Sequence, residues 1–199
     1  MKTIEELKKE TIWEKGKLTI IGAKTLGGKT QLAVYETLKA AEAGNNVLYL
    51  SMLNKKEDIV SRLVFFKLGK RIDYINVQEE DKEIYNEAVE SIENLPIEIE
   101  ECSDLSILDI VEIVKGKKNL DLLIIDPLHA INISNLDVPT RKDKLIKAIK
   151  ELKELSKSQN IGIILTAQMK RDNKGDNDLY QGKEIAELSD KYFAVEIES

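Results

Sequence analysis

Cysteine and histidine are nearly absent from this chain of 199 residues, which has one of each. The single cysteine, Cys102, excludes an intramolecular disulfide and fits a reducing cytoplasm. With one cysteine and one histidine, a zinc site built from these residue types is not expected. No apolar run approaches 18 residues and no signal peptide is evident. The sequence therefore predicts a cytoplasmic protein with no contact to a membrane.

Aromatic residues are also scarce, at 5% of the chain, whereas hydrophobic residues make up an ordinary 42%. The formal net charge of −6 argues against a globally basic protein that wraps DNA. It does not exclude a local basic loop, because binding depends on where the charge lies. The length suits one α/β domain with a sizeable core, or at most two small domains.

Apolar runs alternate with helical patterns along the chain. The expected strands are residues 17–21, 47–51, 96–100, 120–125, 161–165 and 192–197. The expected helices are residues 31–43, 55–68, 79–95, 106–114 and 142–158. This alternation predicts an α/β fold with a mostly parallel, twisted sheet flanked by helices. Residues 132–140 and 170–181 follow strand ends and are expected to be mobile loops on the ligand-binding edge.

The first 13 residues have a charged helical pattern, with Ile4, Leu7 and Ile12 on one side. The apolar side is too thin for a stable isolated helix, so we expect it to pack on the domain or on a neighbouring subunit. The predicted organisation is an N-terminal helix or linker over residues 1–14 and one α/β domain over residues 15–199, whose function the motifs below indicate.

The strongest motif is the stretch 22–30, Gly-Ala-Lys-Thr-Leu-Gly-Gly-Lys-Thr, between the strand 17–21 and the helix 31–43. It departs from the P-loop pattern only at Ala23, which replaces the first glycine. In such a loop the backbone N–H groups and the helix N-terminus face an anion. Lys29 adds a positive charge, and the hydroxyl of Thr30 is available to Mg²⁺. The predicted ATP-binding residues are Ala23, Lys24, Thr25, Leu26, Gly27, Gly28, Lys29, Thr30 and Gln31.

Polar residues follow the two later apolar runs. Asp126 ends the run 122–125 and is predicted to hold Mg²⁺ together with Thr30. Gln168 follows the next strand, where it could sense the γ-phosphate, so Lys29 and Gln168 are the predicted catalytic residues. His129 has two interpretations, a similar sensor or a hydrogen-bonded structural histidine.

The order and spacing of these motifs resemble the RecA-type ATPase core of DnaB-like replicative helicases. The family's Ala-Arg-Pro-Ser-Met-Gly-Lys-Thr is similar to residues 23–30, and its Asp-Tyr-Leu-Gln to residues 126–129. Its Leu-Ser-Gln-Leu-Asn-Arg is similar to residues 165–171, and its Asp-Leu-Arg with an acidic helix resembles residues 178–190. The resemblance spans roughly residues 15–197. It implies a RecA-like P-loop NTPase of helicase superfamily 4 that uses ATP and Mg²⁺.

Two departures from the family make its enzymatic activity uncertain. The family's catalytic glutamate, in Ser-Leu-Glu-Met, falls on Leu53 here. Loss of a general base costs about 10²–10⁴-fold in rate, and Glu57 is not expected to replace it because its side chain should point along the helix. The family's Lys-x-Arg-x-Gly segment, whose arginine reaches a neighbouring subunit's γ-phosphate, would lie beyond Ser199. Such an arginine finger is worth about 10³–10⁵-fold.

Nucleic-acid binding is implied only by the resemblance. In the family, the loops after the magnesium strand and after the glutamine strand contact single-stranded DNA. The corresponding basic residues here are Arg141, Lys170, Arg171 and Lys174. Neighbouring aspartates offset their charge, which predicts weak phosphate contact at physiological salt. A solvated loop of mixed charge is the alternative.

Three functions therefore stay open. The first is a DnaB-like helicase domain in DNA replication or recombination, whose ATP hydrolysis is coupled to single-stranded DNA, as a homo-oligomer or a smaller assembly. The second is a nucleotide-gated module without useful catalysis that loads or regulates a larger helicase or recombinase, which Leu53 favours. The third, a small-molecule kinase, usually needs an arginine-rich lid, and the segment around Arg171 has only that arginine.

Overall fold

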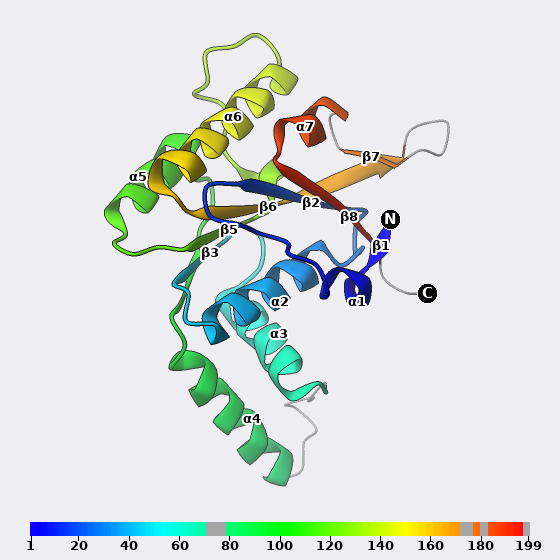
Figure 1. Ribbon diagram of the computed structural model, residues 1–199, viewed down its shortest axis with the longest axis vertical. Helices are drawn as coiled ribbons and strands as arrows, with labels where there is room; N and C mark the ends of the chain where they lie inside the picture. The colour runs from blue at the N-terminus through cyan, green and yellow to red at the C-terminus, as the bar shows by residue number, and fades with distance from the viewer. Residues whose placement is uncertain (71–78, 172–176, 180–182, 197–199) are drawn as a thin grey trace.

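A sheet of seven parallel strands forms the centre of the computed structural model, which describes residues 1–70, 79–171, 177–179 and 183–196. The strand order is β1-β8-β2-β6-β5-β3-β4 (Figure 1). The strands are β1 (Lys2–Thr3), β2 (Leu18–Ala23), β3 (Val47–Ser51), β4 (Ile97–Glu101), β5 (Leu122–Asp126), β6 (Gly162–Arg171) and β8 (Lys191–Glu196). A short strand, β7 (Asn177–Leu179), pairs antiparallel with the end of β6. The predicted α/β fold with a mostly parallel sheet is confirmed.

Helices cover both faces of the sheet (Figure 1). One face carries α1 (Ile4–Leu7), α2 (Lys29–Glu42), α3 (Lys56–Leu68) and α4 (Glu79–Glu93). The other face carries α5 (Ile107–Gly116), α6 (Arg141–Gln159) and α7 (Lys183–Leu188), and a short 3₁₀ helix, η1 (Leu128–Ala130), follows β5. Within the described ranges, no helix has the length and apolarity needed to cross a bilayer.

The strands divide their side chains between two cores. In β3, Leu48 and Leu50 pack in the cluster under α5 and α6, whereas Val47 and Tyr49 pack in the cluster under α2 and α3. Every residue of this strand is buried. A parallel strand covered on both faces needs apolar residues at successive positions, which explains the unbroken apolar runs of the sequence.

The N-terminal segment is less helical than its pattern predicts. Helix α1 ends at Leu7, and Lys2–Thr3 pair with β8 as a strand. Leu7 and Ile12 are both fully buried in the cluster under α2 and α3. A continuous helix would point these two side chains about 140° apart, since each residue turns the helix by about 100°. The expectation of one helix across residues 1–13 was therefore wrong.

Residues 170–171 and 177–179 also differ from expectation, because they form strands and not a loop. β6 continues well past Leu165, and its last residues pair with β7. The register places Met169 opposite Leu179 and Lys170 opposite Asp178. The apolar pattern predicted the end of this strand too early, because backbone pairing with β7 extends β6 beyond the apolar residues.

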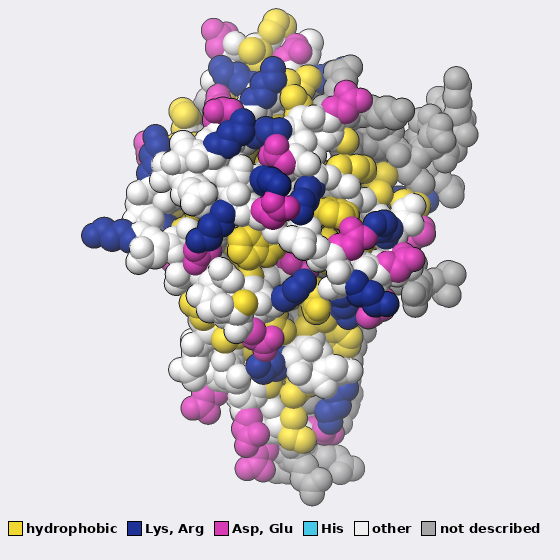
Figure 2. Space-filling view, in the orientation of Figure 1, with side chains coloured by type: hydrophobic (Ala, Val, Ile, Leu, Met, Phe, Trp, Pro, Cys, Tyr) yellow, Lys and Arg dark blue, Asp and Glu magenta, His cyan; other side chains and the backbone are white. Residues whose placement is uncertain are grey.

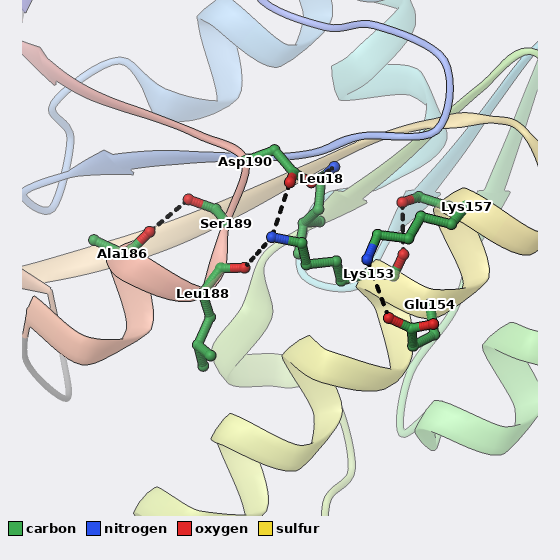
Figure 3. Close-up of polar contacts among 9 residues, drawn as sticks. Leu18, Lys153, Glu154, Lys157, Ala186, Leu188, Ser189 and Asp190 are labelled. Atoms are coloured by element: carbon green, nitrogen blue, oxygen red, sulfur yellow. Dashed lines mark hydrogen bonds and ion pairs between the residues drawn. The ribbon is translucent and has the colours of Figure 1, made fainter.

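Asp190 connects the last strand to β2 and α6 (Figure 3). Its Oδ2 accepts a hydrogen bond from the backbone nitrogen of Leu18 at 2.9 Å, and its Oδ1 pairs with Lys153 Nζ at 2.8 Å. Lys153 also donates to the carbonyl oxygen of Leu188 at 3.0 Å. Burial alone would raise the pKa of Asp190, but the bonds from Lys153 and Leu18 outweigh it and lower the pKa. This ionised carboxylate fixes where β8 joins the sheet.

Glu36 of α2 is a buried carboxylate that is poorly compensated. Its side chain is 1% exposed, and Oε1 accepts no hydrogen bond from a described residue. Lys39 Nζ lies 3.7 Å from this oxygen, close enough to attract it but not to donate. Burial raises the pKa of Glu36 from 4.5 to about 7, and the charge of Lys39 opposes the shift only in part.

Stability is expected to fall as the pH rises from about 4.5 to about 7, because the folded chain retains a proton on Glu36 that the unfolded chain has lost. The loss is at most about 3 kcal/mol, since one pKa unit is worth about 1.4 kcal/mol. Glu36→Gln has no charged form, so it should be more stable than the wild type at pH 8 and not at pH 5. Urea unfolding of both proteins at pH 5 and pH 8 measures the difference in their stability. The same difference at both pH values would contradict the prediction.

Candidate functional site

The loop between β2 and α2 borders an open cavity of about 410 Å³. β2 ends at Ala23, and α2 begins at Lys29 after Gly28, which is left-handed with φ 90°. The first N–H groups of a helix lack partners inside it, so this end carries partial positive charge. Residues 25–31 all line the cavity. The local fold therefore presents backbone donors to whatever the cavity holds, and its volume is in the range of small-molecule sites.

Gly27 shows how tightly this loop closes. A Cβ at this position would lie 2.9 Å from the carbonyl oxygen of Lys24 and 3.1 Å from Ala23 Cβ. The Gly27 N–H donates to the same carbonyl of Lys24 at 2.9 Å. Ala23 is buried at the end of β2 and has no positive φ, so the P-loop pattern's first glycine is not required here. The loop fits a phosphate cradle in shape.

Asp126, at the end of β5, lies directly beside the start of α2. Its Oδ2 accepts hydrogen bonds from Thr30 Oγ1 and from Tyr49 OH, both at 2.9 Å, and its Oδ1 accepts one from Thr166 Oγ1. The side chain is 1% exposed. Burial and the charge of Asp126 raise the pKa of Tyr49 well above its usual value, so this hydroxyl stays a donor. Three elements, α2, β3 and β6, thus orient one carboxylate.

Thr30 and Asp126 were expected to share a Mg²⁺ ion, and the structure brings the two side chains into contact. In the part of the chain that the structure describes, no group of three or more His, Cys, Asp or Glu side chains is placed so that it could hold a metal ion. A divalent cation would depend on these two oxygen donors, on water and on the phosphates of a ligand. Mg²⁺ commonly binds in this way, so the donor set fits it.

Two cationic side chains, Lys29 and Arg62, line the cavity. Neither forms a hydrogen bond or an ion pair with a described residue. Unpaired cations beside the positive end of a helix favour an anionic ligand. Arg62 belongs to α3, and the sequence analysis did not find it as a site residue.

Leu53 also lines the cavity, and its side chain is 65% exposed. By the family resemblance, this position is the one where a catalytic carboxylate is expected. It does lie at the cavity, but its side chain is apolar. Among the described residues that line the cavity, Asp126 is the only carboxylate. Glu57 is exposed and does not line it, as its predicted direction along the helix implies.

Gln168 lies within β6 and not at its tip, because the strand runs on to Arg171. Its position is nevertheless level with the end of β2, opposite Ala23. Gln168 Nε2 donates to Thr25 Oγ1 at 2.7 Å, so the amide contacts the P-loop directly. The structure brings Gln168 and the loop together, and its role as a phosphate sensor stays a prediction.

His129 of η1 is half-buried, and its Nδ1 is buried without a hydrogen bond to any described residue. Burial lowers its pKa, the nearby charge of Lys29 lowers it further, and Asp126 opposes them. The described residues therefore do not support a structural role for His129 that depends on a hydrogen bond at Nδ1. His129 also lines a separate cavity of about 480 Å³ with Arg141 and Lys144.

The residues expected to contact nucleic acid lie in different elements. Arg141 is the first residue of α6, Lys170 and Arg171 end β6, and Lys174 lies outside the described residues. Over the described part of the face drawn in Figure 2, basic and acidic side chains alternate and do not gather by sign.

Tyr49 and Thr166 are two further site residues that carried no predicted role. Each donates a hydroxyl to Asp126 from a neighbouring strand. The strand pairing explains both, since β3 and β6 flank β5 in the sheet. The alternation of side chains along β3 could have indicated that Tyr49 lies on the same face of the sheet as α2. The sequence does not indicate, however, that β3 lies next to β5.

Comparison with known proteins bears on the family and on the fold. The DnaB-like helicase C-terminal domain family matches residues 3–183. A DnaB-like replicative helicase, described with its interactions with primase, has 16% sequence identity and a TM-score of 0.76, covering 90% of this chain and 46% of that one. A second solved structure, of an ATPase domain, has 16% identity and a TM-score of 0.77, covering 91% of this chain and 69% of that one. No curated protein sequence matches.

Proposed function

The chain belongs to the family of DnaB-like helicase C-terminal domains, and on that premise we propose that it binds ATP and hydrolyses it slowly in DNA replication or recombination. The observation that carries the proposal is the 2.9 Å contact between Thr30 and Asp126, beside a P-loop whose Lys29 pairs with no described residue. A buried carboxylate, a hydroxyl and a helix N-terminus are the groups that a magnesium-bound triphosphate needs. The chain spans about half the length of the DnaB-like replicative helicase, so activity of a whole helicase belongs to the proposal.

Each group has a proposed role. Lys29 neutralises the β- and γ-phosphates, and the amides of residues 25–28 hold their oxygens. Thr30 and Asp126 hold the Mg²⁺ ion, which supplies charge neutralisation at the phosphates when bound. Gln168, which contacts the P-loop through Thr25, distinguishes whether a γ-phosphate is present. The placement of the side chains supports these roles, and substitution of each residue can test them.

Leu53 favours a second candidate function, a nucleotide-gated module that loads or regulates a larger helicase or recombinase. A leucine cannot polarise an attacking water, and no other described carboxylate besides Asp126 lines the cavity. Because Asp126 already accepts three hydroxyl hydrogen bonds, it is not free to act as the base. In this candidate, ATP binding changes the shape of the domain without useful turnover.

The test is steady-state ATP hydrolysis with and without single-stranded DNA, alongside ATP affinity by calorimetry. Lys29→Ala is the blank, and Lys150→Ala, an exposed lysine of α6 on the opposite face of the sheet, is the matched control. Turnover that DNA accelerates and Lys29→Ala abolishes supports the helicase domain. ATP binding without turnover above the blank supports the gated module. ATP binding that survives Lys29→Ala contradicts both.

Single-stranded DNA and further copies of the chain are the proposed partners. Arg141 makes no ion pair or hydrogen bond with a described residue, so its charge is available to a phosphate. Because the candidate nucleic-acid residues are few, DNA affinity should fall only slightly as the salt concentration rises. The salt dependence of affinity follows the number of phosphates that the protein neutralises. Sedimentation with ATP and a short oligonucleotide tests whether several copies assemble on it.

A further inference from the structure

The cavity of about 480 Å³ that His129 lines is bordered by η1, by the segment that follows it and by the first turn of α6. The bordering backbone is anchored to the rest of the domain. Ile131 and Ile133 are buried in the cluster under α5 and α6. Between them, the Asn132 N–H donates to the carbonyl oxygen of Leu105 at 2.8 Å. The side chains at this cavity therefore stand on a fixed support.

Two cationic side chains of α6, Arg141 and Lys144, line this cavity. Arg141 makes no hydrogen bond or ion pair with a described residue. Lys144 Nζ donates to the carbonyl oxygen of Ser134 at 2.7 Å, and an ammonium group has two further N–H donors. Arg141 is also the first residue of α6, where the helix N–H groups lack partners inside the helix. These groups together favour an anionic ligand.

A carboxylate, Asp104, also lines the cavity and restricts which anion fits it. Asp104 Oδ1 accepts a hydrogen bond from Asn132 Nδ2 at 2.9 Å, which orients the side chain. An ionised carboxylate can only accept hydrogen bonds, so it repels an anion that has no proton to donate. Inorganic phosphate retains a P–OH group at neutral pH, whereas sulfate and the phosphodiester of a nucleic-acid strand have none. The cavity therefore suits inorganic phosphate better than either of these.

We propose that this cavity binds inorganic phosphate, with Arg141 and Lys144 donating to its charged oxygens and Asp104 accepting from its P–OH group. The inference goes beyond the proposed function and does not rest on it, because it needs no nucleotide at the P-loop. The proposed ATP hydrolysis would supply the same ion. Besides burial, the charges of Lys29 and Arg141 both lower the pKa of His129, so this ring lies within electrostatic reach of the P-loop and of the cavity.

His129 reports on binding, because it lines the cavity and is the single histidine of the chain. Its imidazole resonance in NMR spectra at constant pH should shift as inorganic phosphate is added, with potassium chloride at matched ionic strength as the reference. Arg141→Gln should weaken phosphate binding about tenfold, since it removes a charge-assisted hydrogen bond. Lys147→Gln is the matched control, because Lys147 is an exposed lysine of α6 that does not line the cavity.

Asp104→Asn tests the selectivity between anions. Asp104 is exposed and has a φ of 64°, a conformation that asparagine also adopts, so the variant should fold. The wild-type chain should bind phosphate more tightly than sulfate. An amide can donate to an oxygen of either anion, so Asp104→Asn should bind the two about equally. Equal affinity of the wild-type chain for phosphate, sulfate and dimethyl phosphate would show that the cavity attracts any anion, and would overturn the inference.

The P-loop is itself proposed to bind phosphate groups, so Lys29→Ala separates the two sites. This variant should retain the phosphate-dependent shift of His129. If Lys29→Ala removes the shift while Arg141→Gln retains it, the ion binds at the P-loop, which overturns the inference and leaves the proposed function in place. A shift no larger than that caused by chloride would also overturn the inference. Failure of the wild-type chain to bind ATP would overturn the proposed function and not this inference.

Discussion

Leu53→Glu is expected to raise the rate of ATP hydrolysis about 100-fold over the wild-type chain. A general base in the right place is worth about 10²–10⁴-fold, and the lower end suits a site not shaped for it. Leu53 lines the nucleotide cavity and is 65% exposed, so a carboxylate can reach the cavity without being buried. An exposed substitution of this kind usually changes stability by less than about 0.5 kcal/mol. Single-turnover hydrolysis with Mg²⁺ and excess enzyme measures the chemical step.

Leu53→Gln is the control for this gain, because it has the size and polarity of glutamate but cannot accept a proton. It should hydrolyse ATP at about the wild-type rate. A gain with Gln equal to that with Glu would show that polarity or water access limits the rate, and the missing base would no longer explain slow turnover. No gain in either variant would favour the gated module.

The P-loop and Asp126 were predictable because each is encoded locally. An apolar run, a loop of small residues and a helical pattern follow one another at residues 17–43, so sequence order alone places Lys29 at a helix N-terminus. Asp126 is the first charged residue after a buried strand, and the carboxyl ends of parallel strands share one edge of the sheet. The motif spacing then indicated the family, which the comparisons confirm.

Features that depend on distant pairing were missed. Arg62 reaches the site only because α3 packs next to α2, and helix packing leaves no short-range pattern. β7 depends on pairing with β6, and β1 on pairing with β8. The two-residue strand β1 has no apolar pattern, since backbone hydrogen bonds to the edge of the sheet define it.

Asp126→Ala is expected to lower the free energy of unfolding by about 2–6 kcal/mol, a large share of a typical total of about 5–15 kcal/mol. The substitution removes the acceptor of three hydroxyls, on Thr30, Tyr49 and Thr166, and leaves Tyr49 and Thr166 buried without it. Each unpaired buried donor costs about 1–3 kcal/mol. Urea unfolding without nucleotide measures the change, because a bound nucleotide would add its own contribution to the stability of the folded chain.

Asp126→Asn separates the structural role of this carboxylate from its role toward the cation. It keeps one carbonyl oxygen as an acceptor, so it should lose less stability than Asp126→Ala. Its affinity for ATP with Mg²⁺ should nevertheless fall about 10–100-fold, the usual cost of removing a carboxylate on which a metal site depends. With ATP and EDTA the two chains should bind alike, since no cation is then involved. If Asp126→Asn lost the same affinity in Mg²⁺ and in EDTA, Asp126 would act only by holding Thr30 and the strands together, and the magnesium site would have to lie elsewhere.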